Sequence, residues 1–367
     1  MSFRARTARL SGELRARGVD VLLLDGAVDV RYLTGFTGSN ALALIAAAQD
    51  APQLFFTDFR YDTQAAEQVP DVFAREIANA DLLEAAAAAL AARAPEGGRL
   101  GFQESAITVK QHTRLRELLP AGWELVPCDG LPARLREVKD EEEVRRIRAA
   151  AELADAALRE SVIERGLVGR SERDVAIELE LRMRRLGAEG PSFPSIVAGG
   201  AHSALPHAEP RDVAIAPATL VTIDWGAVLD GYCSDCTRTF ATGQISEEQR
   251  EVYELVLRAQ TQALAAVRPG PSGRELDTVA REIIEQAGHG EHFGHGLGHG
   301  VGLEIHEGPR LSRTLGEQPL RAGNVVTVEP GVYLPGRFGV RIEDLVLVTE
   351  HGSETLSGLP KELTALA

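Results

Sequence analysis

The residues that could do chemistry are concentrated in a short glycine- and histidine-rich stretch, residues 293–307. His295 and His299 are four residues apart, and His306 follows seven residues after His299. Imidazole is the commonest nitrogen ligand for metals, and glycine lets the backbone approach a ligand closely. This stretch alone leaves two interpretations open, a metal-binding segment or a flexible loop that would chelate a metal only by accident.

Four carboxylates elsewhere favour the metal-binding interpretation. Asp224, Glu329 and Glu343 each lie in a run rich in β-branched residues, a pattern typical of a buried strand. A buried carboxylate must be paired or bound to a cation, because its desolvation is costly. With Asp235 these groups bring four negative charges, which two divalent cations would balance. The electrostatics therefore predict a dinuclear metal centre that also includes His299.

Composition limits the partners that such a centre can have. The chain has 367 residues and a net charge of -15, which argues against binding to nucleic acid or to an anionic membrane. It contains no uninterrupted apolar span long enough to cross a bilayer, so we expect no transmembrane segment. The arginine-rich start, residues 1–18, lacks the apolar stretch of a secretory signal and predicts an amphipathic helix.

The three cysteines are too few for a disulfide framework, so a cytoplasmic location is expected. Cys233 and Cys236 form a Cys-x-x-Cys pattern, which indicates redox chemistry or zinc binding in some proteins. Residues three apart on a strand point to opposite faces, and no second pair of cysteines completes a zinc site. We therefore favour a structural role for both.

The elements that must position these residues fall into two predicted domains, residues 1–132 and 133–367. In the first, short apolar strands at 19–24, 41–46, 53–57, 99–102 and 123–127 alternate with helices at 81–94 and 109–119. This pattern predicts an α/β domain of common size, without a carboxylate cluster of its own.

The second domain contains a weak internal repeat. Ser171 and Ser272, 101 residues apart, each open a helix with a Ser-x-x-acid capping signal. Each helix is preceded by a longer one, at residues 140–165 and 246–267, and followed by strand-like segments. We therefore expect two similar halves with helices over a shared antiparallel sheet, which is a duplicated α+β domain.

The order of these motifs resembles the pita-bread metallopeptidases, family M24. The matching segments are residues 223–226, 234–239, 295–300, 329–331 and 341–344. This family contains Xaa-Pro aminopeptidases, Xaa-Pro dipeptidases (prolidases), methionine aminopeptidases and creatinase. Residues 33–38 and 57–61 resemble the creatinase-type N-terminal domain. The resemblance implies an α/β N-terminal domain followed by a pita-bread α+β catalytic domain.

The resemblance also implies a role for each candidate residue. Asp224, Asp235, His299, Glu329 and Glu343 would hold two metal ions, with Asp235 and Glu343 bridging both. Glu329 would also act as the general base. His207, His295, His306 and Arg341 would be the catalytic and substrate-binding residues around these ions. His207 and His306 would lie near the scissile peptide, whereas His295 would be a nearby histidine that does not bind metal.

The implied activity is removal of an N-terminal residue from small peptides, with proline second. The alternatives are a two-domain aminopeptidase without a proline requirement and a non-catalytic peptide-binding module on the same fold. The full set of five candidate ligands, which creatinase lacks, argues against the binding module. Oxygen ligands with one imidazole suit Mn²⁺, with Zn²⁺ and Co²⁺ as alternatives. The family commonly dimerises, so a homodimer is expected.

Two details of the second domain are left open. Arg341 could pair with a protein carboxylate, or it could bind a substrate carboxylate or a backbone carbonyl. Cys236 and Leu345 depart from the residues that the family often has at these positions. Neither departure changes the ligand set, although both could reshape the pocket.

Overall fold

The chain divides into two compact units in this computed structural model, which describes residues 1–48, 51–79 and 81–366. The units are Met1–Arg136 and Glu137–Ala367. The division lies four residues beyond the expected boundary at residue 132.

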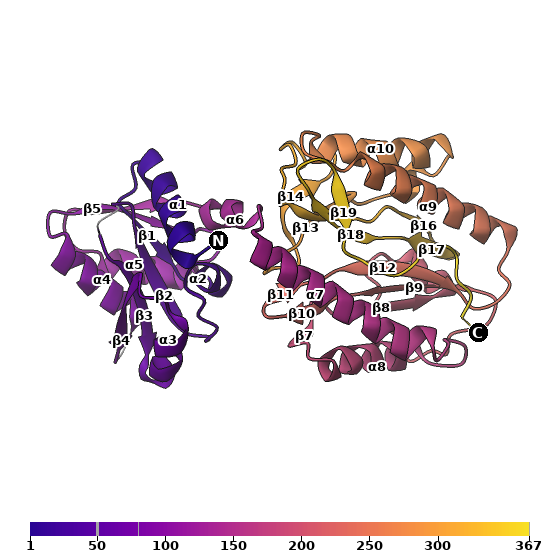
Figure 1. Ribbon diagram of the computed structural model, residues 1–367, viewed down its shortest axis with the longest axis horizontal. Helices are drawn as coiled ribbons and strands as arrows, with labels where there is room; N and C mark the ends of the chain where they lie inside the picture. Colours follow the sequence, from indigo (N-terminus) through magenta and orange to yellow (C-terminus); the bar gives the residue numbers. More distant parts are fainter. Residues whose placement is uncertain (49–50, 80, 367) are drawn as a thin grey trace. The chain divides into compact units, whose positions relative to one another are not determined.

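The first unit is built on a six-stranded mixed sheet in the order β4-β3-β2-β1-β5-β6 (Figure 1). Its strands are β1 (Val21–Leu24), β2 (Ala41–Ala46), β3 (Gln53–Asp58), β4 (Phe73–Ala78), β5 (Gly98–Phe102) and β6 (Trp123–Pro127). One face packs on α4 (Leu82–Arg93) and α5 (Val109–Leu118) through a leucine-rich cluster. Two further helices, α1 (Phe3–Ala16) and α2 (Ala27–Thr34), contact β2. The predicted α/β class is confirmed.

Among the described residues of this unit, four α-helices and strands were not predicted from the sequence. They are α2, α3 (Asp62–Gln68), β4 and α6 (Leu131–Arg136). The three helices are short, with eight, seven and six residues. A helix of one or two turns shows too little apolar periodicity to be distinguished from a loop. β4 is an edge strand with several exposed side chains, so its pattern does not mark a buried strand.

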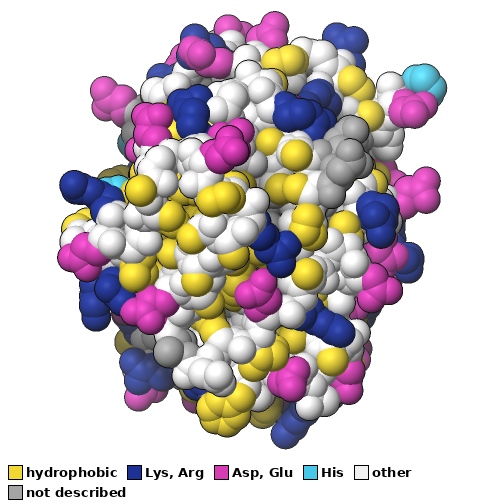
Figure 2. Space-filling model, turned by 90° about the vertical axis from the view of Figure 1, so that its left-hand side faces the viewer, with side chains coloured by type: hydrophobic (Ala, Val, Ile, Leu, Met, Phe, Trp, Pro, Cys, Tyr) yellow, Lys and Arg dark blue, Asp and Glu magenta, His cyan; other side chains and the backbone are white. Residues whose placement is uncertain are grey.

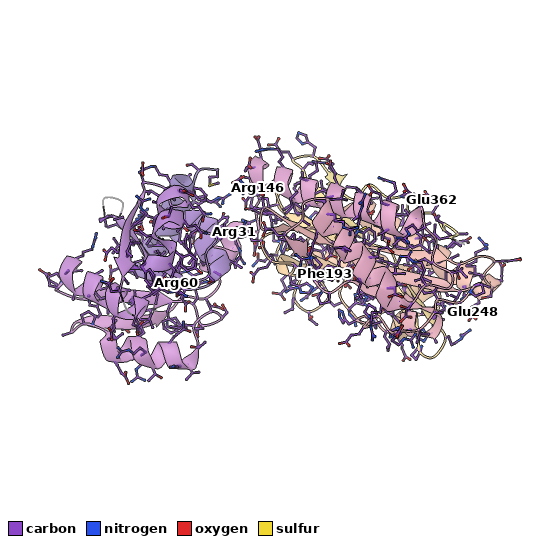
Figure 3. The ribbon with its side chains drawn as sticks, turned by 90° about the horizontal axis from the view of Figure 1, so that it is seen from below. Arg31, Arg60, Arg146, Phe193, Glu248 and Glu362 are labelled. Atoms are coloured by element: carbon purple, nitrogen blue, oxygen red, sulfur yellow. The ribbon has the colours of Figure 1, made fainter. Side chains whose placement is uncertain are left out.

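The surface of the first unit carries charges of both signs. In the view of Figure 2, basic and acidic side chains are interspersed among apolar ones. Arg60, which is labelled in Figure 3, follows β3 and binds Asp58 with a distance of 2.8 Å between Nη2 and Oδ2. Asp58 also accepts a hydrogen bond from the backbone N–H of Arg60, which caps the short 3₁₀ helix Phe59–Tyr61.

The second unit contains the two expected helix pairs. The first pair is α7 (Glu141–Leu158), extended by a π-helical turn at Arg159–Ile163, and α8 (Glu172–Arg185). The second pair is α9 (Glu247–Ala266) and α10 (Gly273–Gln286). Ser171 and Ser272 cap α8 and α10 by accepting from backbone N–H groups, as predicted.

Each helix pair covers strands of its own half of this unit (Figure 1). The earlier half has sheets β12-β9-β8 and β11-β10-β7, and the later half has β14-β13-β15-β18-β19 and the hairpin β16-β17. The bounds are β7 Gly190–Pro191, β8 Ile196–Gly199, β9 Leu220–Trp225, β10 Ala227–Leu229, β11 Tyr232–Cys233, β12 Cys236–Ala241, β13 Gly298–Gly300, β14 Glu307–Leu311, β15 Val325–Val328, β16 Gly331–Leu334, β17 Phe338–Arg341, β18 Asp344–Val348 and β19 Ser353–Thr355. The predicted duplicated α+β class is confirmed, although separate sheets replace one shared sheet.

Two further sequence predictions can be compared with the structure. No helix within the described ranges is both long and apolar enough to cross a membrane. Cys128, Cys233 and Cys236 are buried and free of disulfides.

Candidate metal centre

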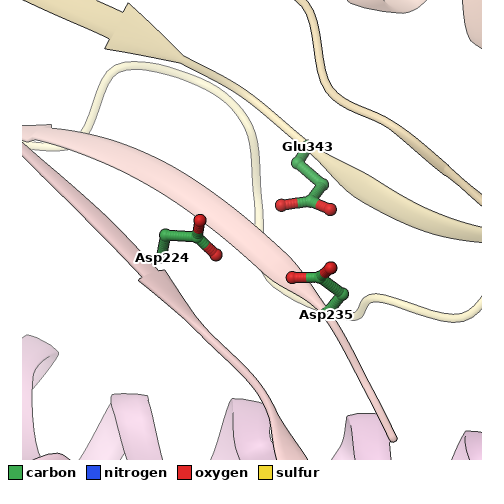
Figure 4. Close-up of side chains that lie close together, drawn as sticks. All are labelled: Asp224, Asp235 and Glu343. Atoms are coloured by element: carbon green, nitrogen blue, oxygen red, sulfur yellow. The ribbon is translucent and has the colours of Figure 1, made fainter. Parts of the chain in front are cut away.

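Three carboxylates converge between the two halves of the second unit. Asp224 lies in β9, Asp235 immediately precedes β12, and Glu343 lies at the junction of β17 and β18 (Figure 4). Each offers an oxygen, and these oxygens all lie within 4.8 Å of one another. The first two residues come from the earlier half and the third from the later half, so the cluster forms only when the halves pack together.

Local strand pairing explains why these three side chains meet. In the β9–β12 pair, Asp224 lies opposite Thr237. Thr237 then links the two halves, because its carbonyl accepts from the Glu343 N–H at 3.1 Å and its hydroxyl donates to Glu343 Oε2 at 2.7 Å. The chain between β9 and β12 reverses direction after β10, at residues 230–231. Gly226 permits close approach of the two arms, since a Cβ atom there would lie 2.0 Å from the Ser234 carbonyl oxygen.

The cluster is electrostatically unfavourable as an assembly of carboxylates alone. Burial raises the pKa of Asp235 well above its usual value, and the charges of Glu343, Asp224 and Glu329 raise it further. Burial, followed by Glu329 and Asp224, has the same effect on Glu343. Oδ1 of Asp224 and Oε1 of Glu343 are buried without a hydrogen-bond partner. Unpaired buried oxygens of this kind are suited to binding a cation.

His299 and Glu329 lie beside the three carboxylates. His299, in β13, directs Nε2 to within 3.6 Å of an Asp235 oxygen and 3.3 Å of a Glu329 oxygen. Its other ring nitrogen, Nδ1, lies 3.1 Å from the Gly300 carbonyl oxygen, which can only accept a hydrogen bond. Nδ1 therefore carries a proton, and in the neutral ring the lone pair of Nε2 faces the carboxylates. A metal-binding histidine has this arrangement.

The pKa of Glu329 is lowered, whereas the pKa values of Asp235 and Glu343 are raised. Burial raises it, but in the metal-free protein a charged His299, which donates from Nε2 to Glu329, lowers it below its usual value of 4.5, and His295 and Arg341 lower it further. Glu329 also accepts a hydrogen bond from the Thr327 hydroxyl at 2.9 Å. Glu329 follows β15 and precedes Pro330, so it stands at the end of a strand.

The donor set fits two divalent cations. It offers four carboxylates and one imidazole, and two of its oxygens have no partner in the protein. Hard oxygen ligands with one nitrogen suit divalent ions of the Mg²⁺ to Zn²⁺ range. The structure brings together the five residues that the sequence analysis named as candidate ligands, which are Asp224, Asp235, His299, Glu329 and Glu343.

Arg341 is paired with a protein carboxylate, which was one of the alternatives left open. Its Nη2 donates to Asp224 Oδ2 at 2.7 Å, and its Nη1 donates to the Tyr333 hydroxyl at 2.9 Å. The Tyr333 hydroxyl lies 2.9 Å from His295 Nε2, while His295 Nδ1 is 2.8 Å from the Gly296 carbonyl. Both ring nitrogens of His295 are thus engaged away from the carboxylate cluster.

His207 and His306 line the same cavity as the five ligand residues. The cavity has a volume of about 640 Å³. The ring of His306 lies 4.3 Å from that of His299, centroid to centroid. Phe193, which is labelled in Figure 3, contributes to the apolar part of the wall. The other apolar wall residues are Pro194, Ile196, Pro206, Ala208, Pro210, Ile305 and Leu315.

Sequence reasoning missed three residues that contribute to this site. Thr237 and Tyr333 orient Glu343 and Arg341, and Arg310 lines the cavity beside His306. Thr237 lies two residues after Asp235, and a strand alternation would have placed it on the same face. Tyr333 and Arg310 lie in no motif, so the sequence carries no signal for them.

Comparison with known protein families gives two matches along the chain. Residues 145–350 match the profile of metallopeptidase family M24. Residues 6–138 match that of the creatinase/prolidase N-terminal domain. The two matches follow the division of the structure into two units.

Individual relatives and solved structures agree with this result. The chain is 42% identical to the uncharacterized peptidase YqhT of Bacillus subtilis, over 95% of this chain and 96% of that protein. It is 49% identical to the Xaa-Pro dipeptidase of Pyrococcus furiosus, over 62% of this chain and 65% of that protein. The structure matches that of a Xaa-Pro dipeptidase from Bacillus anthracis with a TM-score of 0.93 and 37% identity, covering all of both chains. An X-Pro aminopeptidase from Thermotoga maritima matches with a TM-score of 0.87 and 36% identity, over 96% and 99% of the chains.

Proposed function

Because this chain belongs to metallopeptidase family M24, and so is a hydrolase of peptide bonds, we propose that it removes the N-terminal residue from peptides with proline second. The observation that carries the proposal is the cluster of buried carboxylates, whose charges and unpartnered oxygens require cations. Relatives and solved structures named as Xaa-Pro peptidases support the preference for proline.

Each site residue then has a defined task. Asp224, Asp235, His299, Glu329 and Glu343 would hold two divalent ions, which would supply Lewis acidity and lower the pKa of a water molecule. Glu329, whose pKa is lowered, accepts the proton of the attacking water and passes it to the leaving amine.

The histidines act on the peptide rather than on the metals. His207 and His306 line the cavity, and we assign to them hydrogen bonds to the carbonyl of the scissile bond. His295 and Arg341 support this region, since they are joined through Tyr333 to Asp224.

The cavity walls favour a compact, apolar second residue. Phe193, Ile196 and Ile305 are among the apolar side chains around the carboxylates. Proline presents an apolar ring and no backbone N–H, so such a wall accepts it without leaving a donor unpaired. The alternative without a proline requirement is not favoured by the named relatives.

The test compares Xaa-Pro, Xaa-Pro-Yaa and Xaa-Ala-Yaa peptides at equal concentration with Mn²⁺ present. We expect rapid cleavage of at least one proline peptide and slow cleavage of Xaa-Ala-Yaa. Cleavage of Xaa-Ala-Yaa alone would overturn the proline preference and leave an aminopeptidase. No cleavage by a protein that holds two metals would overturn the catalytic proposal in favour of a binding module.

The metal is proposed to be Mn²⁺, because oxygen donors with a single imidazole suit it. Reconstitution with Mn²⁺, Zn²⁺ and Co²⁺ in turn should give the highest activity with Mn²⁺. Higher activity with either of the others at full occupancy would contradict this assignment.

Assembly and location complete the proposal. The resemblance to dimeric members of the family supports a homodimer, which light scattering tests by its mass. Free buried cysteines support a reducing, cytoplasmic location. Cell fractionation tests the location, and recovery outside the cytoplasm would contradict it.

A further inference from the structure

The loop that carries His207 is tied down at both ends by one buried carboxylate. Glu172 occupies the first turn of α8 and is only 2% exposed. Its Oε1 accepts from the Gly199 N–H at 2.9 Å, at the end of β8. Its Oε2 accepts from the Arg211 N–H at 3.0 Å. Gly199 and Arg211 bracket the segment that contains His207, so this one carboxylate closes the loop.

Two side chains of the loop strengthen the same contact. Arg211 binds Glu172 in a two-pronged pair, with Nε 3.0 Å from Oε2 and Nη2 2.9 Å from Oε1. His202 Nδ1 lies 2.9 Å from Oε2. Charge-assisted and bidentate contacts are stronger than neutral ones and hold a fixed geometry. The N-terminal position of Glu172 on α8 adds a favourable helix dipole.

The middle of the loop rests on the site itself. The Ser203 hydroxyl accepts from the Gly339 N–H at 2.8 Å, and a Cβ atom on Gly339 would lie 2.1 Å from the Ser203 carbonyl oxygen. The Pro206 carbonyl, next to His207, accepts from Arg341 Nη1 at 3.1 Å. Backbone contacts also hold the two ends of the loop, because Gly199 pairs with Val221 in the sheet and the Arg211 carbonyl accepts from the Arg173 N–H at 3.0 Å. The Glu172 side chain adds the contact that links these two ends to each other.

We propose that Glu172 is a positioning residue that places His207 in the cavity of the metal centre by closing residues 199–211 into a fixed loop. Glu172 itself does not line the cavity, so it acts through the loop. His207 is exposed on that loop, and holding an exposed loop in one conformation costs backbone entropy. The contacts of Glu172 with Gly199, Arg211 and His202, which we call the clamp, offset this entropy cost before substrate binds. The inference rests on the proposed function through the role given there to His207.

The main experiment is a double-mutant cycle of Glu172→Gln with His207→Ala. Glutamine keeps the size of the side chain but removes the charge and replaces one acceptor with a donor facing Arg211. We expect a fall in kcat/KM of at least ~10-fold, because small displacements of a catalytic group cost up to about 10²-fold. Metal content should stay at the wild-type value. In the His207→Ala background the same substitution should change kcat/KM less than ~2-fold. Equal losses in both backgrounds would overturn the proposal.

Hydrogen exchange gives a second measurement that needs no substrate. The amides of residues 199–211 should exchange faster in Glu172→Gln than in the wild type, with the metal-ligand strands unchanged. Unchanged exchange in this loop overturns the clamp whatever the activity. If the wild type cleaves no peptide, the proposed function fails, while exchange still tests the clamp.

The matched control is Glu178→Gln on the same helix, where the carboxylate pairs with Arg170 at 2.7 Å. It makes the same charge change and should leave kcat/KM and loop exchange unchanged. If Glu172→Gln does not fold, Arg211→Lys provides the test, because the Arg211 side chain is 46% exposed and lysine keeps the charge without the fork. The fall in kcat/KM caused by Arg211→Lys should be smaller than that expected for Glu172→Gln, and it should also vanish in the His207→Ala background.

Discussion

Glu343 and Asp344 are neighbours in the chain, are each 1% exposed, and lie in opposite electrostatic surroundings. Glu343 meets Asp224 and Asp235, and one of its oxygens has no partner. Asp344 accepts from Arg238 at 2.8 Å, from Lys361 at 2.6 Å and from Gln260 at 3.0 Å. Burial is the same for both residues, so burial does not separate a functional carboxylate from a structural one. The balance of charge and of hydrogen bonds does.

The two clusters are also physically joined. The Arg238 guanidinium, which neutralises Asp344, donates to the Glu343 carbonyl oxygen and to the carbonyls of Leu359 and Pro360. We call Asp344, Arg238, Lys361 and Gln260 the balanced cluster, and Glu343, Asp224 and Asp235 the unbalanced cluster. A side chain of the balanced cluster therefore holds the backbone of the unbalanced cluster. A framework of satisfied charges can keep unsatisfied carboxylates close together until cations bind.

The largest effect is expected for Asp235→Asn, which removes one anion from the unbalanced cluster. We expect loss of at least one metal and a fall in activity of more than ~10²-fold, beyond the ~10–100-fold typical of outer-shell changes. The metal-free variant should melt at a higher temperature than the metal-free wild type, because repulsion is relieved. Elemental analysis, peptide assays and circular dichroism measure these outcomes. Two tightly bound metals in the variant would contradict a bridging role for Asp235.

A smaller but still large effect is expected for Glu329→Gln, which keeps the size of the side chain and removes its ability to accept a proton. The kcat should fall at least ~10²-fold, by more than partial metal loss explains. Steady-state kinetics at saturating metal measure this. Full recovery of the rate on adding metal would mean that Glu329 is a ligand only.

The balanced cluster should respond in stability rather than in chemistry. Asp344→Asn leaves Arg238 and Lys361 without their carboxylate, and breaking a buried pair costs about 3–5 kcal/mol. Chemical denaturation measures the loss. Glu343→Gln is the matched control, and in the metal-free protein it should cause no such loss. A similar destabilisation by both substitutions would show that the two clusters do not differ in the way described.

The smallest effect is expected at Asp155. Its carboxylate has fewer favourable contacts than that of Asp344 but more than that of Glu343. Burial raises its pKa from 3.8 to about 6, although the Gly358 N–H and the charge of Arg238 oppose the shift. The folded protein therefore binds this proton more tightly than the unfolded chain does. The associated stability is present below pH 3.8 and is lost as the pH rises through about 6.

Asp155→Asn removes this dependence and should stabilise the protein by about 1–3 kcal/mol at pH 7. Thermal melts between pH 4 and pH 8 measure it. Glu152→Gln, on the exposed side of the same helix, should leave the pH profile unchanged. A variant less stable than the wild type at pH 7 would show that the Asp155 carboxylate is better satisfied than its pKa indicates.

Helix starts and candidate ligand residues could be predicted from the sequence, because their signals depend on residues that are close together in the chain. Ser171 and Ser272 marked the starts of their helices, because the hydroxyl of a capping serine accepts a hydrogen bond from a backbone N–H only three residues later. Asp224, Glu329 and Glu343 could be recognised as candidate ligands because carboxylates in β-branched runs conflict with burial unless a cation is present. These signals are local, so the helices of the second unit and the candidate ligands could be predicted.

Which charged and polar side chains pair with one another could be seen only in the folded protein. Arg341 could have paired with several acids, and its contact with Asp224 joins residues 117 positions apart. Glu172 gave no signal, because its partners Gly199 and Arg211 reach it only after β8 and the His207 loop have packed on α8. Glu343 and Asp344 are adjacent acids whose roles differ because the chain turns between β17 and β18 and sends them into different clusters. Pairing of charges depends on distance in space, and distance along the chain does not determine it.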